Sequence, residues 1–128
     1  MKRDLDLIRN MLLTIESIDA DNPHKIFIGT FMDLCGDPYI ISQHIQLLMD
    51  SGFIEADGPF YDDDIADFYI RRITSAGYDY LDSVRDPSIW AATKNKLQKI
   101  GGSAALDIVK EIATNLLTAS LTGHFLSG

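Results

Sequence analysis

Four polar side chains that can form hydrogen bonds with a partner recur at helical spacing near the middle of the chain. They are Tyr39, Ser42, Gln43 and Gln46. Residues three and four apart share one face of a helix. Serine, glutamine and tyrosine can donate hydrogen bonds to bases and phosphates, so DNA reading is one function that this segment supports.

The distribution of charge argues against that function. Between Ile26 and Ile70 the sequence contains no lysine or arginine, and the whole chain has a formal net charge of −8. Nucleic-acid binders normally use cations to neutralise phosphates. The same stretch is rich in carboxylates: Asp33, Asp37, Asp50, Glu55, Asp57, Asp62, Asp63, Asp64 and Asp67. Such a surface favours a basic protein partner.

The run Asp62-Asp63-Asp64 is the densest group of metal-type ligands in the sequence. Carboxylate oxygens suit hard cations such as Ca²⁺. A calcium loop, however, needs alternating acidic ligands, a central glycine and a terminal glutamate, and this run has none of them. We therefore expect a solvated acidic loop and no metal.

No constellation for catalysis can be assembled from the residue list. The single cysteine, Cys35, has no histidine at a suggestive spacing, and His24, His44 and His124 are far apart. Phosphate-loop, dinucleotide-turn, zinc-protease and nucleophile-elbow motifs are missing. We expect no enzyme activity and no cofactor, and we interpret His44, which has apolar neighbours on its helix, as structural.

Length and composition are typical of one small globular unit. A chain of 128 residues falls within the usual domain size of roughly 100–150 residues. Asp4 and Asp6 interrupt the segment where a signal peptide needs an apolar region, and one cysteine cannot form an internal disulfide. We expect a cytoplasmic protein, with no membrane association.

The periodicity of apolar residues predicts the first half of the fold. A helix is expected from Asp4 to about Ile18 and another from Pro38 to about Ser51, with Asp37 as its cap. Strands 53–56 and 68–73 should form a hairpin around a loop that contains Asp57-Gly58-Pro59 and the three aspartates. A short strand is expected over 25–28, and 30–35 is either one helical turn or an irregular connection.

Three further helices are expected in the second half. Thr74 should cap the first, with an apolar stripe of Tyr78, Leu81 and Val84. The second should begin at Asp86-Pro87, with a stripe of Trp90, Thr93, Leu97 and Ile100. Ser103 should cap the third, whose stripe is Val109, Ile112, Ala113, Leu116 and Leu117. Val109, Ile112 and Leu116 either support a homodimer or fold back on the same chain.

This order of elements is that of a winged helix. We predict an α+β, mainly α fold: a winged helix-turn-helix core with a β-hairpin wing, and a two-helix C-terminal extension. The winged-helix domain should occupy 1–86 and the helical extension 87–128. The expected core includes Leu47, Leu48, Phe53, Leu81 and Trp90.

Three segments resemble one family. They are MKRDLDLIR at the start, HIQLLMDSGFIE from His44 to Glu55, and ITSAGYDYLDSVRDPSIW from Ile73 to Trp90. Together they resemble an uncharacterised family of short winged-helix proteins found in phages, prophages and other bacterial mobile elements. The resemblance covers most of the chain and implies a fold and a genetic setting. It implies no catalytic residues.

The leading hypothesis is a non-enzymatic interaction module that presents an acidic recognition-helix and wing surface to a basic protein, such as a host defence or transcription component. The alternative is a DNA-binding transcriptional regulator. The residues expected to contact the partner are Tyr39, Ser42, Gln43, Gln46, Asp50, Asp57, Asp62, Asp63 and Asp64.

Overall fold

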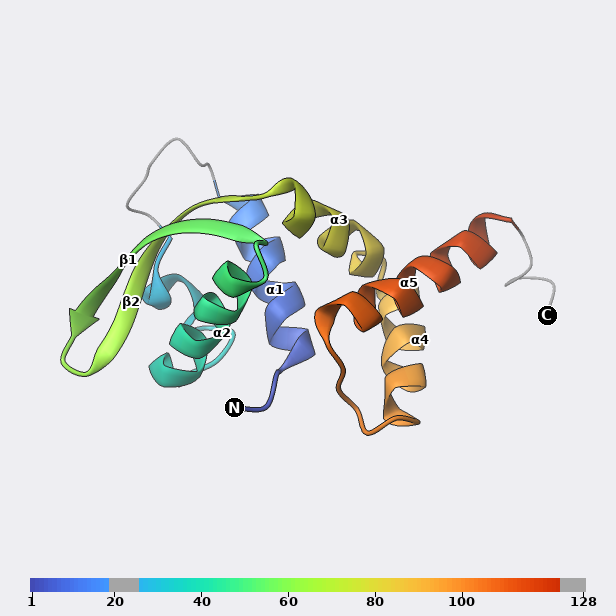
Figure 1. The fold of residues 1–128 in the computed structure, drawn as a ribbon, viewed down its shortest axis with the longest axis horizontal. Helices are drawn as coiled ribbons and strands as arrows, with labels where there is room; N and C mark the ends of the chain where they lie inside the picture. The colour runs from blue at the N-terminus through green and yellow to red at the C-terminus, as the bar shows by residue number, and fades with distance from the viewer. Residues whose placement is uncertain (19–25, 123–128) are drawn as a thin grey trace. The chain divides into compact units, whose positions relative to one another are not determined.

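The computed structural model describes residues 1–18 and 26–122 (Figure 1). These residues form an α+β structure that is rich in helices and has one antiparallel two-stranded hairpin. In chain order the elements are α1 (Leu5–Ser17), the 3₁₀ helix η1 (Ile28–Phe31), α2 (Pro38–Asp50), β1 (Ile54–Asp62), β2 (Ile65–Ile73), α3 (Ser75–Val84), α4 (Pro87–Gln98) and α5 (Leu106–Leu121).

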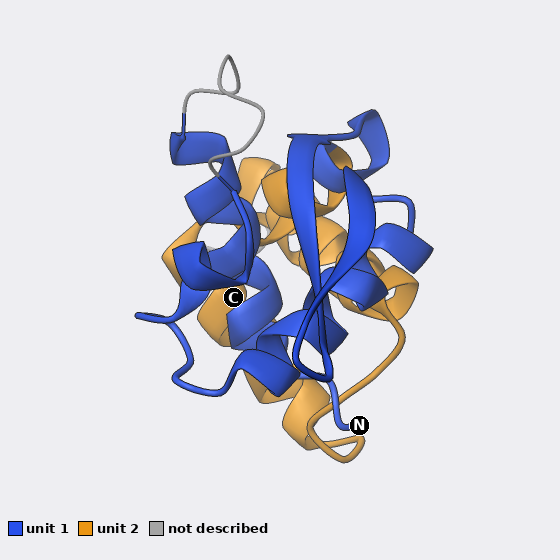
Figure 2. Ribbon diagram, turned by 90° about the vertical axis from the view of Figure 1, so that its left-hand side faces the viewer, with its two compact units in different colours: residues 1–78 blue, residues 79–128 orange. Residues whose placement is uncertain are grey.

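The chain divides into two compact units (Figure 2). The first is Met1–Tyr78 and the second is Asp79–Gly128, so the boundary falls within α3. The division at Asp86 that the sequence suggested stays a prediction. None of the helices in the described part of the chain is both long and apolar enough to cross a membrane.

Both predicted helices of the first unit are confirmed. Asp4 caps α1 by accepting a hydrogen bond from the Leu7 backbone N–H at 3.0 Å. Asp37 caps α2 in the same way through the Tyr39 N–H, and Pro38 occupies the first helical turn, where no donor is needed. Of the two expected core residues on α2, Leu48 is fully buried, whereas Leu47 is only half-buried and is not a core residue.

The strand expected over 25–28 is wrong for the described residues Ile26–Ile28. Ile26 makes one ladder-like contact, in which its carbonyl accepts from the Ile70 N–H at 2.8 Å. The chain then turns into η1, because the Asp67 carboxylate accepts the Ile28 N–H at 2.9 Å and Thr30 accepts the Phe27 N–H. For residues 30–35 the sequence left open one helical turn or an irregular connection. The structure has the end of η1, at Phe31, followed by turns.

The hairpin is longer than the sequence predicted. Its turn is only Asp63-Asp64, and Asp57-Gly58-Pro59 lies within β1 instead of in a loop. The register shifts between Asp57 and Phe60, as in a β-bulge. Gly58 allows the bulge because its φ of 131° is open mainly to glycine, and Pro59 has no N–H to place in the ladder.

The second unit contains a helix pair, α4 and α5, that pack against each other. Asp86 caps α4 by accepting from the Ser88 and Ile89 N–H groups, as predicted. Ile100, expected in the stripe of α4, lies beyond the helix end and is 60% exposed. Ser103 does not cap α5, because the helix begins later, after Ala105.

The apolar stripe of α3 was also misassigned at one position. Tyr78 is 40% exposed, and Tyr80 is fully buried in its place. A repeat of three residues drifts around a helix that has 3.6 residues per turn. The buried positions follow the mixed spacing of three and four instead, through Gly77, Tyr80, Leu81 and Val84.

Leu48→Ala should lower the free energy of unfolding by about 2–5 kcal/mol, because it opens a cavity at a fully buried position. Urea unfolding followed by circular dichroism measures the change. Leu121→Ala is the control, since that side chain is 81% exposed and its loss should cost little. Equal stability of the two variants would show that α2 does not pack as described.

Gly77→Ala should destabilise the first unit by about 1–3 kcal/mol. A Cβ at Gly77 would collide with the Phe53 carbonyl oxygen and lie 2.6 Å from the Ile73 Cγ2 atom. Gly36→Ala is the matched control, because a Cβ there meets nothing within 4 Å. Thermal unfolding of both variants compares them, and a Gly77→Ala protein as stable as the control would contradict the close packing of Gly77 on Phe53 and Ile73.

Candidate functional site

One face of α2 is exposed along its whole length. Tyr39, Gln43, Gln46 and Asp50 are all exposed and follow each other at steps of four, three and four. Four of the five residues of α2 predicted to contact a partner therefore share one accessible face. Ser42 does not, because it is only 4% exposed and lies under the hairpin.

Ser42 belongs to a short chain of hydrogen bonds that joins α2 to β2. Its hydroxyl donates to the Ala66 carbonyl, and the Gln46 Nε2 group donates to Ser42 Oγ at 3.2 Å. The direction is fixed, since the serine proton is already used on Ala66 and its oxygen must accept. The Gln46 amide is thereby oriented, and its carbonyl oxygen Oε1 remains available as an acceptor.

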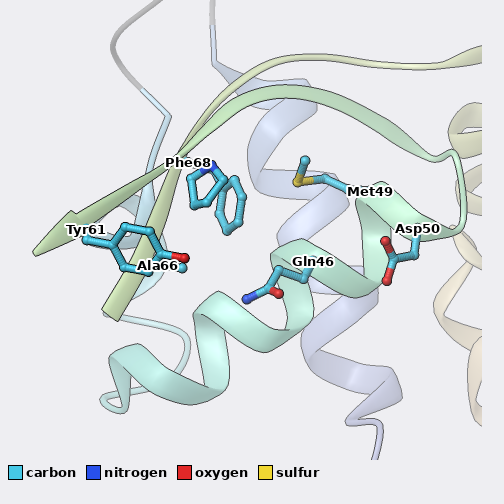
Figure 3. A pocket seen from close by; sticks show the side chains of 7 residues that line it. Gln46, Met49, Asp50, Tyr61, Ala66 and Phe68 are labelled. Carbon is cyan, nitrogen blue, oxygen red and sulfur yellow. The ribbon is translucent and has the colours of Figure 1, made fainter. Parts of the chain in front are cut away.

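A groove of about 210 Å³ lies between α2 and the hairpin (Figure 3). Gln46, Met49 and Asp50 line it from α2, and Tyr61, Ala66 and Phe68 from the hairpin, together with Pro59. We call it the α2–hairpin groove. Phe68 is 3% exposed and forms part of the floor, whereas Tyr61 is 71% exposed.

Gln46 and Asp50 were predicted from the sequence, whereas the other lining residues were not. Tyr61, Ala66 and Phe68 share one face of the hairpin because Tyr61 pairs with Ala66 and side chains alternate along β2. Phe60 and Tyr69 lie on the opposite face, with ring centroids 5.0 Å apart. The sequence signal was this alternation, which becomes readable only once the strands are known to extend to Asp62 and Ile65.

Three of the predicted acidic residues gather at the hairpin turn. Asp62 ends β1, and Asp63 and Asp64 form the turn, with all three exposed. Asp63 has a φ of 52°, a conformation that aspartate tolerates better than most residues. Among the described residues no hydrogen bond or ion pair satisfies these three carboxylates or that of Asp50. Their charge is directed to solvent.

At the base of the hairpin, by contrast, the charges are paired. Arg72 donates two hydrogen bonds to the Glu55 carboxylate, at 2.8 and 2.9 Å, and these bonds lower the pKa of Glu55 and raise that of Arg72. Arg71 lies 3.5 Å from Asp57. Asp57, predicted to contact a partner, therefore already has a partner within the hairpin.

Two other acidic residues have structural roles. Asp37 caps α2, and Asp67 accepts the N–H groups of Ile28 and Phe68 through one oxygen. Hydrogen bonds to backbone donors fix a carboxylate in place and reduce its availability to a partner. Among the described residues, the unpaired carboxylates of the first unit thus include Asp50 at the end of α2, the three aspartates at the hairpin turn, and the exposed Asp33.

His44 is structural, as expected. It is 1% exposed, its Nε2 atom accepts the Asp4 N–H at 3.0 Å, and its Nδ1 atom lies 2.8 Å from the Ile40 carbonyl oxygen, to which it donates. His24 and His124 lie outside the described residues. Within the described part of the chain, no group of three or more histidine, cysteine, aspartate or glutamate side chains is placed to hold a metal ion.

The residues predicted to form a homodimer are only partly accessible on α5. Val109 and Leu116 are buried within the chain and Ile112 is half-buried. The exposed apolar side chains of this helix include Ile108 and Leu121, at 42% and 81%. Self-association through α5 stays a prediction.

Ser42→Ala should lower the free energy of unfolding by about 1–3 kcal/mol, because it leaves the Ala66 carbonyl without its donor. Gln43→Ala, at the exposed neighbouring position, should change it by less than about 0.5 kcal/mol. Urea unfolding of the two variants tests the contact. If the two substitutions cost the same, the hairpin does not dock on α2 through Ser42.

Comparison with known proteins places the chain beside sequences of no assigned function. A family model described as "Hypothetical protein (DUF2513)" matches residues 2–104. A Haemophilus influenzae protein described as "Uncharacterized protein" is 28% identical over 121 residues, which cover 94% of this chain and 99% of that protein. No solved structure matches the chain.

Proposed function

Because the chain belongs to the DUF2513 family, whose description names no activity, we propose a function from the surface that the chain presents. The chain is a non-enzymatic interaction module. A winged-helix scaffold offers an acidic surface to a basic protein partner. This acidic surface consists of Tyr39, Gln43, Gln46 and Asp50 on α2, and Asp62, Asp63 and Asp64 at the end of the hairpin.

The order and contacts of the first unit support a winged helix. The helices α1 and α2 are followed by a hairpin that adjoins α2, which is the position of the wing (Figure 1). The short η1 stands where such a fold has its second helix. The hydrogen bond from the Ile70 N–H to the Ile26 carbonyl stands where a third strand would pair with the wing.

The distribution of charge carries the proposal. The stretch from Ile26 to Ile70 has no lysine or arginine, and the first cations beyond it, Arg71 and Arg72, are held by Asp57 and Glu55. The exposed carboxylates have no counter-charge at the same place. A polyanion such as duplex DNA would be repelled there, whereas a basic protein surface would be attracted.

The expected partner is a protein that itself binds nucleic acid. Such proteins have basic surfaces, and exposed carboxylates can occupy positions that phosphates normally take. The resemblance to proteins of phages and other mobile elements agrees with a role as an inhibitor or modulator of a host defence or transcription component.

A DNA-binding transcriptional regulator is the second candidate. Its support is that Tyr39 and Gln43 are exposed on the helix that would enter the major groove. Hydrogen bonds from these side chains would supply sequence preference, but the surface around them supplies little attraction to phosphates.

Asp62→Asn, Asp63→Asn and Asp64→Asn, made together, should weaken capture of basic proteins from a bacterial lysate by the immobilised chain. The control carries Asp79→Asn, Asp107→Asn and Glu111→Gln, which change the net charge equally at exposed positions of α3 and α5. It should capture the same proteins as the wild type, and the wild type should not retard duplex DNA at low salt.

The regulator becomes the better proposal if the wild type binds duplex DNA in a sequence-selective and salt-sensitive way that Gln43→Ala abolishes. Equal loss of captured protein in both triple variants would show that net charge matters and the acidic surface does not.

A further inference from the structure

We infer that the α2–hairpin groove receives one arginine side chain of the protein partner. The inference rests on the proposed function and names the chemistry by which the acidic surface recognises its partner. It is carried by the groove's size, its apolar walls and the orientation of its polar groups.

The size of the groove fits a single side chain. At about 210 Å³ it is smaller than the roughly 300–1,000 Å³ of pockets that hold small-molecule ligands. It is also open to solvent on the side of Tyr61, which is 71% exposed. A long side chain that projects from a partner can therefore enter it without any rearrangement of the hairpin.

The walls suit the aliphatic part of such a side chain. The ring of Tyr61 stands near one end of the groove, Met49 and Phe68 lie between, and Asp50 stands at the other end (Figure 3). Arginine carries three methylene groups that pack on apolar surface while the charged end reaches a polar partner. Tyr61 would cover these methylenes and remove them from water.

Two acceptors line the groove on the side of α2. The hydrogen-bond chain from Gln46 through Ser42 to Ala66 leaves Gln46 Oε1 free to accept, and the Asp50 carboxylate is acceptor-only. None of the lining residues is a lysine or arginine. The groove therefore favours a ligand that donates hydrogen bonds, and the charge of Asp50 makes a cationic donor the best fit.

The spacing of these acceptors favours arginine over lysine. Gln46 and Asp50 are four residues apart on α2, so their side chains are neighbours on one face, about 5–6 Å apart at Cβ. A planar guanidinium has five N–H donors in a fixed fork that can reach both acceptors, whereas an ammonium is a compact point charge. The aspartates at the hairpin turn add long-range attraction without contacting this side chain.

The test uses fluorescein-labelled nonapeptides with two lysines, glycine spacers and a central arginine, lysine or citrulline, measured by fluorescence anisotropy with the full chain. Citrulline keeps the shape of arginine without its charge. The wild type should bind the arginine peptide at least about fivefold more tightly than either of the others. Asp50→Asn should remove this preference.

Tyr61→Ala should weaken binding of the arginine peptide by at least about threefold. Tyr61→Phe should bind it like the wild type, because the ring is kept. The matched controls are Phe60→Ala, on the opposite face of the hairpin, and Asp107→Asn, on α5. Both should bind like the wild type.

The results separate the groove from the acidic surface. One outcome is that the triple variant of Asp62, Asp63 and Asp64 binds all three peptides more weakly, while Asp50→Asn and Tyr61→Ala bind them like the wild type. The proposed acidic surface would then be supported, and the proposed arginine site would be wrong. If the wild type binds none of the peptides, or binds duplex DNA in their place, both proposals are wrong.

Discussion

The surface proposed to act depends on one buried contact, the hydrogen bond from Ser42 to the Ala66 carbonyl. It fixes β2 against α2 and so places Tyr61 and Phe68 opposite the exposed face of the helix. It also determines which end of the Gln46 amide faces outward. A hydroxyl at Ser42 thus sets both the shape of the α2–hairpin groove and the hydrogen-bonding character of its wall.

Pairing of charges at the base of the hairpin leaves the acidic surface with a net negative charge. Arg71 and Arg72 are neutralised by Asp57 and Glu55 on the neighbouring strand, so they add little positive potential. Exposed ion pairs of this kind contribute little to stability. Their effect here is on the distribution of charge, because carboxylates such as Asp50 and those at the hairpin turn are left without a cation.

Local signals in the sequence predicted the helices well and the hairpin poorly. Asp37-Pro38 and Asp86-Pro87 specify helix starts through backbone geometry, and both were correct. The extent of the hairpin depends on pairing between strands, which Gly58 and Pro59 obscure by introducing a bulge. Burial of Ser42 was missed for a related reason, since its hydroxyl donates to the Ala66 carbonyl on the hairpin, a partner that the local sequence does not reveal.

The most direct measurement is a nuclear magnetic resonance titration of the isotope-labelled chain with the arginine peptide. Amide signals report the site of contact residue by residue, without requiring any variant to fold. The largest shifts are expected at Gln46, Asp50 and Tyr61, with smaller ones at the hairpin turn. Shifts confined to α5, or shifts on the exposed face of α2 that appear with duplex DNA and not with the peptide, would contradict a surface made for a basic protein.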